Sequence, residues 1–129
     1  MTCFWDGIMG SLNKNDKKEL GLNDNNIYTL IEILQKKNIK TENIKWQRKK
    51  LTDRELKENM LHIGSYKKST AKRGYLCGTQ DPFLLLLCFL LKRKIHFIYC
   101  GTLIEYEPFS VKEEALKYKC DRGHFAGNR

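Results

Sequence analysis

Two residues near opposite ends of the sequence have the chemistry of a nucleophile and its base. Cys3 opens the run Cys3-Phe4-Trp5-Asp6-Gly7, and His124 lies in the run Asp121-Arg122-Gly123-His124-Phe125. A free thiol has a pKa of about 8.5, so it is mostly protonated at neutral pH and needs an imidazole beside it to react. Such pairs are usually built from positions that are distant in sequence and adjacent in the fold. The two runs therefore suggest a thiol–imidazole pair.

The residues that follow Cys3 have the pattern of a short helix. It spans residues 4–12 and starts near Thr2 and Cys3. The unpaired N–H groups and the dipole at a helix N-terminus stabilise a thiolate, and they also stabilise the oxyanion that forms when a carbonyl is attacked. We therefore expect the backbone N–H groups of Thr2 and Cys3 to form an oxyanion site. Gly123, directly before the histidine, would let its loop approach closely.

Three further helices are expected before any strand. Residues 27–34 carry apolar side chains at i, i+3, i+4 and i+7 after two asparagines that can cap a helix. The run Thr52-Asp53-Arg54-Glu55 is a capping box, so a second helix begins there. Asp81-Pro82 begins a third, because Asp is a good N-cap and Pro fits the first turn. Residues 83–91 of that helix are apolar nearly all round, which predicts a central position.

Strands are expected only in the last third of the chain. Residues 95–100 and 103–106 alternate around Gly101-Thr102 and predict a hairpin, and residues 115–119 predict a third strand. The remaining segments, 13–25, 39–50 and 64–74, are polar and rich in breakers, so we expect loops there. His124 is expected on a loop after the third strand.

Length and composition fit a single α+β domain over residues 1–129. No apolar run reaches the roughly 20 residues of a membrane span, and no signal peptide is expected. The five cysteines include no Cys-x-x-Cys pair, which favours reduced thiols in an intracellular, cytoplasmic protein. The net charge of +9 indicates either a polyanionic partner or a general bias toward lysine.

A longer pattern joins the two ends of the chain. Its runs are Cys3-Phe4-Trp5-Asp6, Gly74-Tyr75, Asp81-Pro82-Phe83-Leu84-Leu85-Leu86-Leu87, Ile95-His96-Phe97-Ile98-Tyr99, Leu103-Ile104-Glu105-Tyr106, Leu116-Lys117-Tyr118 and Gly123-His124-Phe125. This pattern resembles the ovarian-tumour (OTU) family of cysteine proteases. In that family a catalytic Cys begins a helix, a central apolar helix leads into a hairpin, and a later strand delivers the catalytic His before an aromatic residue.

The resemblance implies a papain-like α+β fold with a small, mainly antiparallel sheet flanked by helices. It implies Cys3 as nucleophile and His124 as general base, with Trp5, Gly123 and Phe125 in the substrate cleft. OTU enzymes cleave the isopeptide bond after the C-terminal glycine of ubiquitin or ubiquitin-like modifiers, and they need no cofactor. The opening and closing runs are most similar to short OTU-like proteins of large DNA viruses, which implies the host cytoplasm as the compartment.

The orienting residue of the histidine is open. The family usually places Asn or Asp two positions after the His, where this chain has Ala126. Asp121 and Asn128 are therefore the candidates, with Asp6 as a further one. Only two residues precede the cysteine, where the family usually carries an Asp-Gly run. The alternative to an active isopeptidase is a catalytically degenerate OTU fold that only binds.

Two other groups of residues have more than one interpretation, the cysteines with the histidines and the basic segments. Cysteines 77, 88, 100 and 120 and histidines 62, 96 and 124 lack the paired spacing of a structural zinc site, so core packing is favoured and no metal is expected. The basic segments 45–50 and 67–73 lie beside Trp46 and Tyr66. They suggest either weak nucleic-acid binding, with phosphate contacts and base stacking, or two solvated loops. No membrane partner is expected, and the oligomeric state is open.

Overall fold

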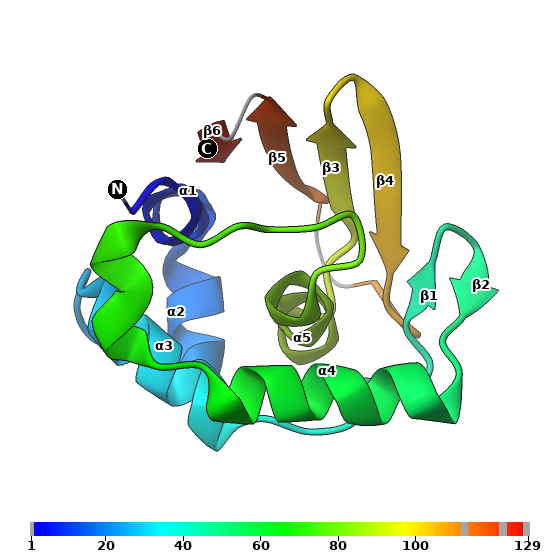
Figure 1. Ribbon diagram of the computed structural model, residues 1–129, viewed down its shortest axis with the longest axis horizontal. Helices are drawn as coiled ribbons and strands as arrows, with labels where there is room; N and C mark the ends of the chain where they lie inside the picture. Colours follow the sequence, from blue (N-terminus) through cyan, green and yellow to red (C-terminus); the bar gives the residue numbers. More distant parts are fainter. Residues whose placement is uncertain (1, 112–113, 122–123, 128–129) are drawn as a thin grey trace.

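The computed structural model describes residues 2–111, 114–121 and 124–127. One sheet forms a layer, and the helices gather on one side of it with α5 at the centre (Figure 1). The helices are α1 (Cys3–Ser11), α2 (Lys14–Leu20), α3 (Ile27–Lys36), α4 (Asp53–Ser65), the 3-10 helix η1 (Lys68–Arg73) and α5 (Pro82–Leu91). The strands are β1 (Lys45–Trp46), β2 (Lys49–Lys50), β3 (Ile95–Tyr99), β4 (Thr102–Glu107), β5 (Leu116–Asp121) and β6 (His124–Gly127). The α+β class is confirmed.

Helix α5 is the centre of the hydrophobic core, as its composition predicted. Residues 83–88 and 91 are buried, because the helix packs against other helices on one side and β4 on another. The carboxylate of Asp81 accepts from the N–H groups of Phe83 at 2.9 Å and Leu84 at 3.3 Å. Pro82 occupies the first turn, where its missing N–H is no loss. The capped N-terminus of α5 therefore fixes the position of Asp81 at the end of the segment before the helix.

The predicted starts of α3 and α4 are also confirmed. Asn26 caps α3 by accepting from the N–H of Tyr28 at 2.8 Å. Thr52 and Glu55 form the expected capping box at α4, each side chain bonding the backbone N–H of the other. These capping bonds join residues two or three positions apart, so they can be predicted without knowledge of the tertiary structure.

The sheet is mixed, which corrects the expectation of a mainly antiparallel one. Its strand order is β2-β1-β4-β3-β5-β6. The β3–β4 hairpin is antiparallel as predicted, whereas β5 runs parallel to β3 on the other edge of that strand. The cause is where β5 begins: the N–H of Leu116 donates to the carbonyl of Lys94 at 2.8 Å, so both strands start at the same edge of the sheet.

Five elements lie where loops were expected: α2, η1, β1, β2 and β6. The segment 13–25 contains α2, which begins with a capping box of Asn13 and Asp16 and ends at Gly21 with a positive φ of 75°. Segment 64–74 contains η1, and segment 39–50 contains the β1–β2 hairpin. His124 begins strand β6 and is not on a loop. The capping box of α2 was a local signal of the same kind as that of α4.

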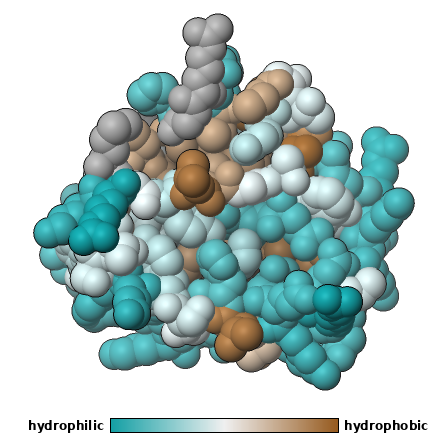
Figure 2. All heavy atoms as spheres, viewed as in Figure 1, coloured by the Kyte–Doolittle hydropathy of each residue, from teal (hydrophilic) through white to brown (hydrophobic). Residues whose placement is uncertain are grey.

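Among the described residues, no helix or strand covers the face of the sheet away from the helices (Figure 1). Along β5 the residues alternate between buried and exposed, with Leu116, Tyr118 and Cys120 facing the helices. The view in Figure 2 shows a mainly hydrophilic surface with scattered hydrophobic residues. Within the described ranges, no helix has the length and apolar character needed to cross a lipid bilayer.

Candidate active site

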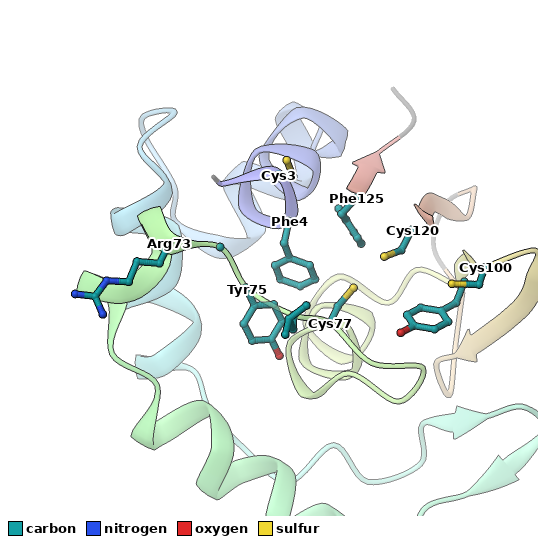
Figure 3. Close-up of a pocket in the computed structure, with 11 residues that line it drawn as sticks. Cys3, Phe4, Arg73, Tyr75, Cys77, Cys100, Cys120 and Phe125 are labelled. Atoms are coloured by element: carbon teal, nitrogen blue, oxygen red, sulfur yellow. The ribbon is translucent and has the colours of Figure 1, made fainter. Parts of the chain in front are cut away.

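A cavity of about 500 Å³ opens where α1, the β-sheet and the segment after η1 meet (Figure 3). Its volume falls in the range of ordinary ligand pockets. Thiols and aromatic rings dominate the wall. The residues that line it are Cys3, Phe4, Arg73, Gly74, Tyr75, Leu76, Cys77, Tyr99, Cys100, Cys120 and Phe125.

Cys3 is the first residue of α1, is half-buried and is one of the residues that line this cavity. Thr2 precedes it, but the Thr2 hydroxyl donates to the Asp6 carboxylate at 2.5 Å and caps no backbone N–H of the helix. Asp6 in turn donates its N–H to the Thr2 carbonyl at 2.8 Å. The first-turn N–H groups at Cys3 are therefore not occupied by a capping side chain, as an oxyanion site requires. Asp6, a candidate orienter, is held by Thr2.

The chain's first helix and last described strand pack side by side. Gly7 and Gly127 make this possible: a methyl group on Gly7 would lie 2.7 Å from the Phe125 ring, and one on Gly127 would collide with the Gly7 carbonyl. The rings of Phe4 and Phe125 have centroids 4.8 Å apart. Below them, the hydroxyls of Ser11 and Tyr118 are hydrogen-bonded at 2.7 Å. The strand that carries His124 thus lies against the helix that carries Cys3.

The His124 ring itself does not enter the cavity. Successive side chains of a strand point to opposite faces, and Phe125 is buried in the cavity wall while His124 is exposed. Asp121 is the cross-strand partner of His124 and is exposed as well. The structure therefore brings Asp121 and His124 together on the outer sheet face. It brings the element of His124, but not its ring, to Cys3.

The other predicted site residues divide between cavity and core. Phe125 lines the cavity as expected for a cleft residue. Trp5 does not: its side chain is 0 % exposed and its Nε1–H donates to the Tyr66 hydroxyl at 3.2 Å. Trp5 is on the buried face of α1, where it packs the helix against Phe83 of α5. Gly123 and Asn128 lie outside the described residues.

A polar chain that runs from the exposed His62 through the half-buried Tyr75 to the buried Asp81 was not expected from the sequence. Tyr75, in the wall, donates its hydroxyl to Asp81 at 2.8 Å, and its oxygen lies 3.2 Å from Nε2 of His62. Burial raises the pKa of Asp81 to about 6, although hydrogen bonds from Tyr75 and the helix N–H groups act in the opposite direction. Burial and the Asp81 charge raise the pKa of Tyr75. Burial lowers the pKa of His62, which favours its neutral form. Only the N-cap role of Asp81 was visible in the sequence.

The cysteines of the wall differ in environment. Burial, then the nearby Cys120 and Asp81, raise the pKa of Cys77, so it is a protonated thiol at neutral pH. Cys100 is exposed, and Cys88 is in the core, away from the wall. All five cysteines are free. Within the described part of the chain, no three His, Cys, Asp or Glu side chains are arranged to hold a metal ion.

Comparison with known proteins adds no relative. No family model matches the chain, and neither a curated protein nor a solved structure is significantly similar to it.

Proposed function

We propose that this protein is a thiol isopeptidase of OTU type, which cleaves after the C-terminal glycine of ubiquitin or a ubiquitin-like modifier. One observation carries the proposal: Cys3 is the first residue of a helix and lies in the wall of an open cavity. A nucleophile needs both access to substrate and a local source of positive potential. The start of α1 supplies the potential through its N–H groups, and the cavity supplies the access.

In this proposal the Cys3 sulfur attacks the carbonyl carbon of the terminal glycine. The developing oxyanion is stabilised by the N–H groups of the first turn of α1, which no side chain caps. His124 takes the thiol proton and gives it to the leaving lysine amine as the C–N bond breaks, which leaves the modifier as a thioester on Cys3. A water deprotonated by His124 then hydrolyses this thioester, which releases the glycine carboxylate and restores the thiol.

Asp121, the cross-strand neighbour of His124, orients its ring. Because the His124 side chain lies on the outer face of β6, it can reach Cys3 only if the strand itself twists or shifts its register when substrate binds. In free enzymes catalytic hydrogen bonds are often long, and they tighten in the substrate complex.

The substrate class follows from the cavity wall and from the resemblance to OTU enzymes. The rim carries Leu76, which is 91 % exposed and offers an apolar contact outside the cavity. Phe4 and Phe125 line the cavity together with Cys3, and their ring centroids are 4.8 Å apart. A chain that ends in glycine fits this aromatic wall as an extended strand, because it brings no side chain to the position beside Cys3.

A second candidate is a binding module that holds the same tail without cleaving it. The orientation of His124 favours this reading, since its ring lies on the sheet face opposite to Phe125. The two candidates share the cavity and differ only in turnover.

The test is a ubiquitin probe with a C-terminal electrophile, applied from about pH 6 to about pH 9, around the pKa of a thiol. An isopeptidase labels at Cys3 and loses labelling in Cys3→Ala. The control Cys100→Ala, which removes the exposed cysteine of the cavity lining, keeps labelling. Labelling should also fall in His124→Ala and persist in His96→Ala, a histidine of the same outer face. No labelling at any pH would refute catalysis. Binding of unmodified ubiquitin to Cys3→Ala would then support the binding module.

A further inference from the structure

The β1–β2 hairpin concentrates positive charge at the edge of the sheet opposite β6 (Figure 1). It spans residues 45–50, and four of these six residues are basic: Lys45, Arg48, Lys49 and Lys50. Arg48, Lys49 and Lys50 are exposed, as is Lys45. No part of this hairpin contributes to the cavity that contains Cys3. A partner of the hairpin is therefore separate from the proposed isopeptidase substrate.

Two neutral residues hold the hairpin rigidly on the protein. The Trp46 indole donates to the Thr79 carbonyl at 2.9 Å. The Gln47 side chain accepts from the N–H of Glu105 at 2.8 Å and donates to the Leu103 carbonyl at 3.3 Å. Because the anchors are uncharged, the cations are left to face solvent on a fixed frame.

The turn of this hairpin is of the kind that matches strand twist. Gln47 and Arg48 have positive φ angles of 50° and 67°, the left-handed conformation that a two-residue hairpin turn requires. Asn and Gly are the usual residues there, so the turn keeps Gln47 and Arg48 against local preference. The hydrogen bonds of Gln47 to β4 offset the conformational cost of its left-handed backbone. Arg48 places a guanidinium at the tip of the hairpin.

The hairpin places like charges side by side, so its cations repel one another. Lys45 and Lys50 are directly opposite across the two strands, and like charges in that position destabilise a strand pair. Among the described residues, no carboxylate forms an ion pair with any of the four cations, although Glu107 is opposite Lys45 on the neighbouring strand. The other basic segment differs, since its Lys68 is paired with Glu32. An anion on the hairpin would relieve the repulsion that the fold itself leaves in place.

We infer that the β1–β2 hairpin binds the phosphate backbone of duplex nucleic acid without reading its sequence. A duplex presents one negative charge per about 1.7 Å of its axis, which suits a compact group of exposed cations on both faces of a ribbon, Lys45 and Lys50 on one face and Lys49 on the other. A two-stranded ribbon also fits the major groove. An anionic membrane is disfavoured, because interfacial binding uses free apolar side chains and the hairpin's one aromatic ring is held by Thr79. The same bond removes Trp46 as a stacking residue, so base stacking is not part of the interaction.

The test measures the affinity of the full chain for a short labelled duplex of arbitrary sequence, by fluorescence anisotropy over a salt series. Each phosphate contact contributes a slope of about −0.9 to the plot of log affinity against log salt, so four contacts predict a slope of about −3.6. Changing the four cations to Gln should weaken binding by more than about tenfold at low salt and bring the slope close to zero. The variant's changes are Lys45→Gln, Arg48→Gln, Lys49→Gln and Lys50→Gln.

A matched control removes the same charge from exposed lysines of α2 and α3. Its changes are Lys14→Gln, Lys18→Gln, Lys36→Gln and Lys37→Gln, and it should keep most of the affinity and the slope. Equal losses in both variants would overturn the inference, as would a flat salt response of the wild type. Stronger binding to vesicles of anionic lipid than to the duplex would overturn it as well. If the fourfold variant does not fold, Arg48→Gln with Lys49→Gln should lower the slope by about half.

Discussion

Asp81 is the buried residue of the polar chain that it forms with Tyr75 and His62, and its pKa can be tested through the stability of the protein. The carboxylate is 1 % exposed, and its pKa is raised from 3.8 to about 6 in the folded protein, mainly by burial. The difference of about 2 units, at 1.36 kcal/mol per unit, corresponds to about 3 kcal/mol of stability. Because the folded-state pKa is the higher one, this stability is present below about pH 4 and is lost as the pH rises through about 6.

The perturbation is Asp81→Asn. Asn does not titrate, and its side-chain oxygen can still accept from the N–H groups of Phe83 and Leu84 as Asp81 does. The free energy of unfolding of the wild type should therefore fall by about 3 kcal/mol relative to the variant between about pH 4 and about pH 7. Tyr75 changes only from donor to acceptor toward position 81, which adds an offset that does not vary with pH.

The assay is urea denaturation of both proteins at a series of pH values, with the difference between the two plotted against pH. Asp53→Asn is the control, because Lys57 and Lys40 lower the pKa of Asp53 at the surface. Its contribution has the opposite sign and is lost as the pH falls. Parallel curves for wild type and Asp81→Asn would refute the raised pKa of Asp81.

Three further predictions concern packing. Gly127→Ala should lower the free energy of unfolding by about 1–3 kcal/mol, because its methyl collides with the Gly7 carbonyl; a urea midpoint no lower than the wild type's would contradict this. Gly64→Ala should stabilise the protein by up to about 1 kcal/mol in the same assay, since its methyl meets only an ordinary contact at 3.6 Å in a helix. Asp16→Ala should lower the free energy of unfolding by about 3–5 kcal/mol in thermal or urea unfolding, because it removes the carboxylate that lies 2.6 Å from the buried guanidinium of Arg93. A decrease in the free energy of unfolding below about 1 kcal/mol would contradict this and would mean that the Arg93 guanidinium becomes hydrated in the variant.

The sequence was most informative where the signal is local. Asp81-Pro82 and the capping box at Thr52 mark helix starts by bonds between residues two or three positions apart, so no tertiary information is needed to recognise them. The box at Asn13 carries the same signal. It was outweighed by the polar composition of its segment, although a short amphipathic helix with Leu20 buried was present.

The placement of the candidate site depends on distant pairings that the sequence does not display. The position of His124 is set by its register against Asp121, and a shift of one residue would turn the ring to the other face. The parallel pairing of β5 with β3 is likewise a long-range choice. Trp5 was expected in the cleft because it lies two residues after Cys3, yet two residues along a helix are a rotation of about 200°, which places Trp5 on the other side of α1. Gln47-Arg48 lacks the usual Asn-Gly signal of a hairpin turn, so the β1–β2 hairpin was missed.

The packing of α1 on the last strands has a kinetic consequence. The hydroxyls of Ser11 and Tyr118 meet across 107 positions of chain, so closing this contact costs more loop entropy than any local helix or hairpin does. Contacts of such high order form slowly. A nascent or refolding chain would gain its central helix and the β3–β4 hairpin first. The thiol at the start of α1 would reach its final surroundings only after β6 has joined the sheet, so reactivity should lag behind the recovery of secondary structure.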